Sequence, residues 1–160
     1  MVQKQENFKE LLAFGVEGEH EIGQYLLSRG VTIMPLYQFE PLEAPVILKG
    51  AEKITMPDLI CFKDDCFFVE VKTKNQWVVY GDRRETGLNL KHYNHYKKIK
   101  DYTGKQVFVF FNQKQDEPLG YYYIELDGYT RLWDGKNPKG EQKFDAMVFY
   151  NFDKLQKVKE

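Results

Sequence analysis

The chain has 160 residues, of which 42% are hydrophobic and 29% are charged, and these values indicate one globular domain over residues 1–160. No apolar run approaches the roughly 18 residues of a membrane helix, and the polar N-terminus lacks a signal-peptide core. Cys61 and Cys66 lie in apolar sequence without histidines at metal-binding spacing, so we expect reduced, buried thiols. The composition predicts a cytoplasmic protein and excludes membrane-spanning and disulfide-rich secreted classes.

The net charge of −1 conceals one basic segment. Residues 72–105 contain nine Lys or Arg against three Asp or Glu, whereas residues 1–71 contain six against twelve. Such a segment inside a near-neutral chain favours a positive face that binds a polyanion. A solvated helix face is the alternative interpretation.

The first predicted element is a helix from about Glu6 to Arg29. Leu12, Ile22 and Leu26 fall on one side of it at helical spacing, and Gly30 ends it. These apolar positions are expected to pack against a sheet.

A strand, a loop and two further strands are predicted next. Val31–Leu36 is the first strand, and Tyr37–Lys53, which contains two prolines, is expected to be a surface loop. The apolar runs Ile54–Phe62 and Cys66–Thr73 flank a polar turn at residues 63–65 and predict a hairpin.

The second half is predicted to alternate between polar and apolar elements. Trp77–Gly87 is polar and irregular, Asn89–Tyr102 is a basic helix, and Gln106–Phe111 is apolar enough for a central strand covered on both faces. The remaining expectations are a strand at Tyr121–Leu126, a turn-rich loop at Asp134–Gly140, a strand at Ala146–Tyr150 and a short helix from about Asp153. This order predicts an α/β or α+β sheet with helices packed on it.

Three charged residues stand in sequence that otherwise resembles a strand core: Asp58, Glu70 and Lys72. Charged side chains are rarely buried unless they are paired or bind a metal. Glu70 and Lys72 are two residues apart on one strand, so they share a face. A cross-strand salt bridge is the alternative, but it explains neither the second carboxylate nor the apolar surroundings.

The chemistry of these side chains suits a divalent cation. Two carboxylates and a backbone carbonyl are good ligands for Mg²⁺, and Mn²⁺ is expected to substitute. Mg²⁺ keeps bound waters, and one of them can attack a phosphodiester. Lys72 would orient that water or help to deprotonate it, and would offset charge in the transition state.

The motif Pro57-Asp58, followed after eleven residues by Glu70-Val71-Lys72, resembles the signature of the PD-(D/E)XK nuclease superfamily. That superfamily includes restriction endonucleases, Holliday junction resolvases and many phage nucleases. The resemblance implies that Asp58 and Glu70 are metal ligands, that Val71 supplies a backbone carbonyl to the metal, and that Lys72 is the catalytic lysine.

The resemblance covers about residues 10–111 and implies a restriction-endonuclease-like fold. This is an α/β fold with a mixed central β-sheet flanked by helices and the core order αβββαβ. Residues 112–160 form a β-rich extension, for which selectivity toward the DNA and a homodimer contact are both open alternatives.

Members of the superfamily often add a helical glutamate, and Glu17, Glu19 and Glu21 compete for this role. Each helical residue advances by about 100°. Glu19 then falls in the apolar stripe with Ile22 and Leu26, whereas Glu17 and Glu21 fall on the solvent side. We therefore predict that Glu19 belongs to the catalytic and metal site and that the other two glutamates are solvated.

The basic segment follows the catalytic strand directly and is expected to contact DNA. Lys and Arg contacts to phosphates give affinity without sequence information, and interleaved aromatic rings can stack on unpaired bases. Core packing is the alternative for the rings of Trp77, Tyr80, Tyr93 and Tyr96. The predicted DNA-binding residues are Lys74, Arg83, Arg84, Lys91, His92, Tyr93 and Lys97.

The pattern as a whole predicts a Mg²⁺-dependent, structure-selective DNA endonuclease in a bacterial or phage-infected cell, acting in a phage, prophage, repair or recombination setting. Its expected partner is DNA, branched or single-stranded, with no membrane. The alternatives are a nucleic-acid-binding module on a nuclease fold that does not cleave, and a structural or interaction protein.

The hairpin register carries a separate prediction. A two-residue loop at Asp64-Asp65 would place Asp58 and Glu70 on opposite faces, because side chains alternate along a strand. A common site needs an odd-length loop or a bulge that sets Asp58 across from Glu70.

Overall fold

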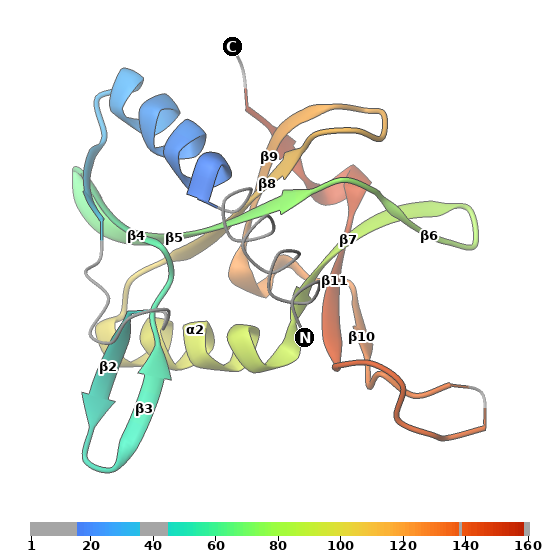
Figure 1. Ribbon diagram of the computed structural model, residues 1–160. Helices are drawn as coiled ribbons and strands as arrows, with labels where there is room; N and C mark the ends of the chain where they lie inside the picture. Colours follow the sequence, from blue (N-terminus) through green and yellow to red (C-terminus); the bar gives the residue numbers. More distant parts are fainter. Residues whose placement is uncertain (1–15, 36–44, 138, 159–160) are drawn as a thin grey trace, which may run out of the picture.

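The computed structural model describes residues 16–35, 45–137 and 139–158, and its centre is a six-stranded mixed sheet (Figure 1). The strand order is β1-β4-β5-β8-β9-β12, and only β5 and β8 run parallel. The strands are β1 Thr32–Pro35, β4 Leu59–Lys63, β5 Asp65–Lys74, β8 Val107–Gln113, β9 Gly120–Glu125 and β12 Gln156–Lys157. The predicted mixed sheet is confirmed.

Two smaller sheets accompany it. One has four strands in the order β10-β11-β7-β6, and the other is a hairpin of β2 and β3. These strands are β2 Val46–Lys49, β3 Glu52–Thr55, β6 Val78–Tyr80, β7 Arg83–Asn89, β10 Arg131–Trp133 and β11 Met147–Asn151. Single 3₁₀ turns, η1 Leu126–Gly128 and η2 Phe152–Lys154, precede β10 and β12.

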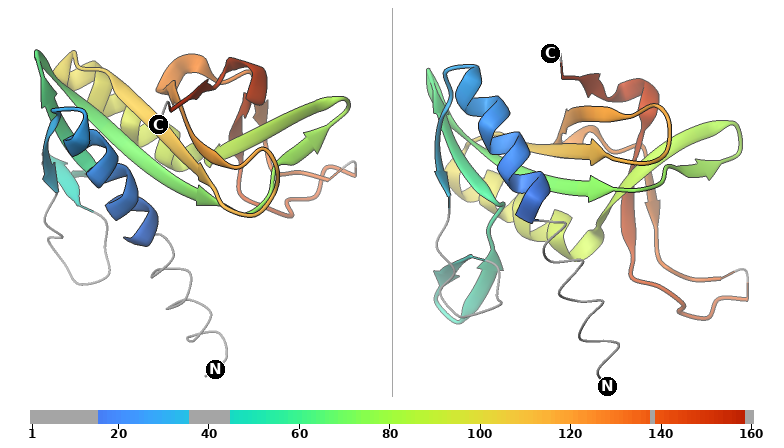
Figure 2. Two further views of the ribbon diagram at one scale, coloured as in Figure 1. Left: turned by 90° about the horizontal axis from the view of Figure 1, so that it is seen from above. Right: turned by 45° about the horizontal axis from the view of Figure 1, so that its top comes forward.

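Two helices cover opposite faces of the central sheet (Figure 2). The N-terminal helix is described from residue 16 to residue 28, and α2 spans Leu90–Thr103. Alternate residues of β5 show the division, because Phe68 joins the buried cluster of α2 whereas Val69 joins that of the N-terminal helix. The helix–sheet–helix layering implied by the resemblance is confirmed, and neither helix is long and apolar enough to cross a membrane in the described part.

The basic helix and the apolar strand after it are where the sequence predicts them. The Asn89 side chain accepts a hydrogen bond from the Lys91 backbone N–H at the start of α2, and Gly104, with φ of 66°, ends the helix. β8 lies between β5 and β9 and is buried on both faces, as its uninterrupted apolar sequence indicates.

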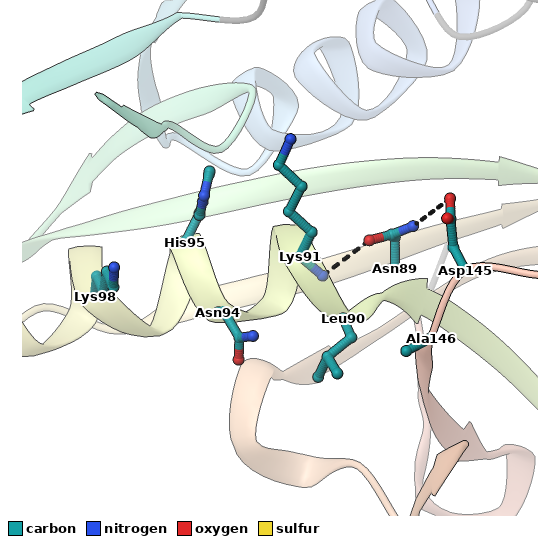
Figure 3. A pocket seen from close by; sticks show the side chains of 8 residues that line it. All are labelled: Asn89, Leu90, Lys91, Asn94, His95, Lys98, Asp145 and Ala146. Carbon is teal, nitrogen blue, oxygen red and sulfur yellow. Dashed lines mark hydrogen bonds between the residues drawn. The ribbon is translucent and has the colours of Figure 1, made fainter. Parts of the chain in front are cut away.

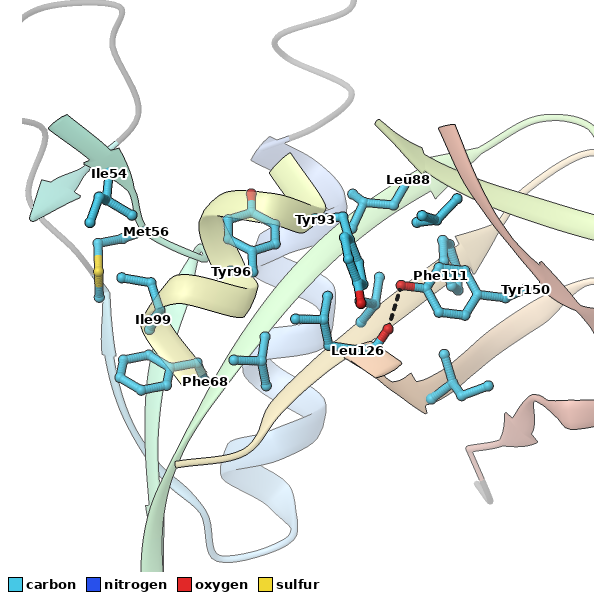
Figure 4. Close-up of a cluster of buried hydrophobic side chains, with 14 residues drawn as sticks. Ile54, Met56, Phe68, Leu88, Tyr93, Tyr96, Ile99, Phe111, Leu126 and Tyr150 are labelled. Atoms are coloured by element: carbon cyan, nitrogen blue, oxygen red, sulfur yellow. Dashed lines mark hydrogen bonds between the residues drawn. The ribbon is translucent and has the colours of Figure 1, made fainter. Parts of the chain in front are cut away.

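One buried cluster joins the second sheet to the central one (Figure 4). Leu88 and Tyr150 come from the four-stranded sheet and pack with Tyr96 of α2 and Phe111 of β8. The Tyr150 hydroxyl donates a hydrogen bond to the Leu126 carbonyl oxygen at 3.0 Å. Residues beyond 111 therefore complete the same hydrophobic core as the residues before them.

Two segments that we expected to be irregular are strands. The β2–β3 hairpin, residues 46–55, includes the second half of the predicted loop Tyr37–Lys53, and most of Trp77–Gly87 forms β6 and β7. The predicted strand Ile54–Phe62 is divided, because residues 54 and 55 belong to β3 and β4 begins at Leu59. Both hairpins turn on two residues beginning with a glycine of positive φ, Gly50 or Gly81. β2, β3 and β6 are only three or four residues long, and β7 buries the polar residues Glu85 and Thr86, so none of these strands shows a clear apolar alternation. Residues 36–44 lie outside the described ranges.

The C-terminal expectations are confirmed for the two strands, β9 and β11. The sequence missed β10, and the helix expected from about Asp153 is only the η2 turn followed by β12. Both C-terminal misses involve elements of only two or three residues, too short to show a period.

Candidate active site

The β4–β5 hairpin turns on a single residue, Asp64, whose φ is 55°. Its register pairs Phe62 with Cys66 and Leu59 with Val69. The next position in this register sets Asp58 across from Glu70. The prediction of an odd-length loop is therefore confirmed, and the turn is the reason that both carboxylates lie on one side of the sheet.

Asp58 lies at an open sheet edge. β4 begins at Leu59, so β5 has no backbone partner on that side beyond Val69. The Asp58 carboxylate replaces it, because its Oδ2 accepts a hydrogen bond from the Val71 backbone N–H at 2.7 Å. N–H and C=O of one strand residue point toward the same neighbouring strand, so the Val71 carbonyl faces this edge as well.

Glu70 is the most deeply buried charged residue of the site, with 1% of its surface exposed. It forms an ion pair with the Lys72 ammonium. Beyond the Lys72 ammonium and the Tyr96 hydroxyl, neither of its carboxylate oxygens has a hydrogen-bond partner within the described ranges. A buried carboxylate normally has several such bonds, so Glu70 has lone pairs to spare for a further cation.

The protonation equilibria of Asp58 and Lys72 reflect the same concentration of negative charge. Burial, together with the charge of Glu70, raises the pKa of Asp58 well above its ordinary range. Burial opposes the charge of Lys72, but Glu70 and Asp58 outweigh it and raise the pKa of Lys72. Lys72 is therefore an ammonium at neutral pH, and the carboxylates would gain from a second positive charge.

The donor set of the site fits a hard divalent cation. It comprises the carboxylates of Asp58 and Glu70 and one backbone carbonyl at an open edge, and oxygen ligands of this kind suit Mg²⁺. Within the described ranges, no group of three or more His, Cys, Asp or Glu side chains is spaced to hold a metal. The predicted third carboxylate, Glu19, thus does not join Asp58 and Glu70 as a preformed triad.

Glu19 nevertheless faces the site from the N-terminal helix. It is half-buried, and burial followed by the charge of Glu70 raises its pKa, while Lys72 lowers it. Ile22 and Leu26 are buried on the same helix, as the predicted stripe requires, and Leu12 lies outside the described residues.

Glu21 is only partly solvated, because 29% of its side chain is exposed and its carboxylate has protein partners, which our prediction missed. It accepts hydrogen bonds from Asn112 Nδ2 at 2.6 Å, from Lys114 Nζ at 2.7 Å and from the Tyr121 hydroxyl at 3.1 Å. The sheet continues beneath the helix through β8 and β9, so the flank opposite Glu19 also meets polar partners. Glu17 is exposed, as predicted.

Helix α2 brings two residues to the site. Burial, and then the charge of Lys72, lowers the pKa of His92, whose Nδ1 is buried without a partner in the described structure. Burial, and then the charges of Glu70 and Asp58, raises the pKa of Tyr96. The sequence predicts only a stacking role for Tyr96. The four-residue spacing between His92 and Tyr96 is the signal that places both on one helix face.

The predicted DNA-binding residues do not form one group. Lys74 lies on β5, two residues beyond Lys72 on the same face, and Arg83 and Arg84 are exposed beside the turn of the β6–β7 hairpin. Lys91 is exposed and lines a cavity of about 500 Å³ along α2 (Figure 3). Lys74 thus borders the site on the strand, whereas the cavity that Lys91 lines includes none of Asp58, Glu70 and Lys72.

Two predicted DNA-binding residues face elsewhere. Tyr93 is buried, donates a hydrogen bond to Asp127 at 3.1 Å and packs its ring on Tyr129. The Lys97 Nζ atom lies 3.8 Å from Oδ1 of the same Asp127. Both residues belong to the contact between α2 and η1, so the structure does not group them with the site.

The predicted stacking rings are mostly structural. Trp77 and Tyr96 are buried, and Trp77 packs edge-on against Tyr122 and Phe152. Tyr80 is exposed and carries the Arg131 guanidinium over its ring.

Comparisons with known proteins bear on the fold. No family model and no curated protein matches the sequence. Among solved structures, the chain is similar to Hjc, a Holliday junction resolvase from Archaeoglobus fulgidus, with a TM-score of 0.56 and 10% sequence identity. The match covers 87% of this chain and 89% of the resolvase chain. The chain therefore has the fold of this resolvase.

Proposed function

We propose that the protein is a Mg²⁺-dependent endonuclease that hydrolyses DNA phosphodiester bonds. The observation that carries this proposal is the buried, under-satisfied Glu70 carboxylate beside Asp58 and Lys72 at an open strand edge. A structural salt bridge would need neither the second carboxylate nor the open edge.

Each residue has a proposed role. Asp58, Glu70 and the Val71 carbonyl would hold the cation, and Glu19 would approach it from the N-terminal helix. Bound Mg²⁺, or Mn²⁺ in its place, would supply Lewis acidity and an activated water. Lys72, whose pKa is raised by Glu70 and Asp58, would orient the attacking water or help to deprotonate it, and would offset the charge that develops on the phosphate.

Structure selectivity is the finer part of the proposal. The similar solved chain is a Holliday junction resolvase, and this likeness favours branched or otherwise irregular DNA as the substrate. Lys74, Arg83, Arg84, Lys91 and His92 would contact its backbone. A homodimer, and a role in phage, prophage, repair or recombination processes, belong to the same proposal.

A cleavage panel tests it. Plasmid, linear duplex, single-stranded and four-way-junction DNA are incubated with the protein in Mg²⁺, in Mn²⁺ or in EDTA. We expect metal-dependent cleavage that Asp58→Asn lowers at least about 100-fold, or about 2.7 kcal/mol in the barrier. Asn retains an acceptor for the Val71 N–H, so the fold should survive.

Glu17→Gln is the matched control, because Glu17 is exposed on the helix that carries Glu19. DNA binding without cleavage under any metal would favour the module that does not cleave. If the protein neither binds nor cleaves DNA, a structural or interaction role is the alternative that remains.

A further inference from the structure

A row of charged side chains continues past the site along β5. Glu70, Lys72 and Lys74 occupy alternate positions and therefore share the face that α2 covers. In the parallel pairing of β5 with β8, Lys74 lies beside Gln113. Residues paired across neighbouring strands point to the same face, so the Lys74 and Gln113 side chains are neighbours.

Both side chains present donors that lack acceptors. Within the described ranges, the Lys74 ammonium has neither an ion pair nor a hydrogen bond, although burial and the charge of Lys72 lower its pKa to about 8. Gln113 has only 2% of its surface exposed, and its Nε2 has no hydrogen-bond partner in the described structure. An unpaired cation and an unsatisfied amide cost free energy, and their persistence side by side indicates a site for an anionic acceptor.

The position of this pair suggests which anion it binds. Two residues along a strand span about 6.6 Å, which is comparable to the separation of neighbouring phosphates along a nucleic-acid chain. Lys72 faces the position of the scissile phosphate under the proposed function. Lys74 and Gln113 lie one such step further along the same face.

We propose that Lys74 and Gln113 bind a non-scissile phosphate of the nucleic-acid strand, next to the phosphate at Asp58, Glu70 and Lys72. This assignment rests on the proposed nuclease function. It requires only that the nucleic-acid strand run along β5 in the direction of Lys74.

Lys74→Met provides the test because it removes the charge and keeps the length of the side chain. Binding of a single-stranded oligonucleotide is measured in EDTA over a range of salt concentrations, and melting is measured with and without inorganic phosphate. We expect DNA affinity to fall at least about fivefold and the salt slope to decrease by about 1. Without ligand, the variant should melt at least about 3 °C higher, because an unpaired, half-buried cation is gone.

Two further variants sharpen the comparison. Gln113→Met should weaken DNA binding about twofold to fivefold without changing the salt slope, because it removes a neutral donor. Lys143→Met is the control, since Lys143 is exposed and lies in the segment between β10 and β11. It should change neither affinity nor melting.

The outcomes separate this assignment from the proposed function. A Lys74→Met variant that melts lower and binds DNA normally would show a structural role and overturn the phosphate site. Phosphate-dependent stabilisation that needs Lys74, with unchanged DNA affinity, would assign free phosphate and also overturn it. If Lys74→Met loses DNA affinity while the wild-type protein cleaves no DNA with any metal, the phosphate site is retained and the nuclease function is refuted.

Discussion

At the scale of single residues, the candidate site is a concentration of charge that the folded chain only partly compensates. Glu70 is buried, and in the described structure only Lys72 and Tyr96 interact with its carboxylate. Burial, and then the nearby charge of Glu70, raises the pKa of Asp58. Sites that bind cations show this imbalance, whereas structural ion pairs are usually completed by further hydrogen bonds.

Glu70→Gln should destabilise the protein by about 3 kcal/mol, because it leaves the Lys72 ammonium without its main partner. The double variant Glu70→Gln with Lys72→Met removes both charges and should regain most of that loss. Urea denaturation in EDTA measures the stability, and the cleavage assay should find both variants inactive. Equal stability of the single and double variants would show that the two charges are not coupled.

At the scale of elements, the N-terminal helix is fixed to the sheet on both flanks of Glu19. On one flank, Glu21 accepts hydrogen bonds from Asn112 of β8, from Lys114 and from Tyr121 of β9. Gly18 packs directly on β5, where an added Cβ would lie 2.0 Å from Thr73 Oγ1. The close approach fixes the backbone next to Glu19, whose pKa is raised by burial and then by the charge of Glu70.

Gly18→Ala should lower both stability and cleavage, because the helix must shift away from Thr73. We expect a loss of about 1–3 kcal/mol, although alanine is otherwise favoured in helices. Thr73→Ala removes the clashing hydroxyl, so the double variant should recover stability and activity. Glu19→Gln should lower cleavage at least about tenfold in either background, or about 1.4 kcal/mol. Additive effects of the Gly18 and Thr73 substitutions would rule out the contact.

At the scale of the whole molecule, the basic residues proposed to contact DNA lie in two separate places. One group borders the site on β5 and α2, and the other, Arg83 and Arg84, lies at the end of the β6–β7 hairpin, which extends away from the central sheet in Figure 1. A bound nucleic acid that reached both would have to cross from the central sheet to the second sheet.

Arg83→Ala with Arg84→Ala should weaken DNA binding and reduce the salt slope by about 2 if the hairpin contacts the backbone. Stability should change by less than about 1 kcal/mol, because both side chains are exposed. Fluorescence anisotropy over a salt series, with Lys143→Met as control, measures the slope. An unchanged slope would confine the DNA path to β5 and α2.

The sequence by itself determined the elements whose signals are local. The apolar runs of β5 and β8 and the caps of α2 depend on residues within a few positions of one another, and so does the motif from Asp58 to Lys72. The requirement that two carboxylates share one face was enough to predict an odd-length turn, and Asp64 provides it.

Only the tertiary structure decided which flanking residues reach the site. Glu21 meets Asn112 and Tyr121, about a hundred positions away, because β8 and β9 pass beneath the N-terminal helix. Tyr96 rather than Tyr93 faces Glu70 because the rotation of α2 is set by the two sheets that it contacts. Strand order brings these partners together, and a periodic pattern in one segment contains no information about the surface that segment will meet.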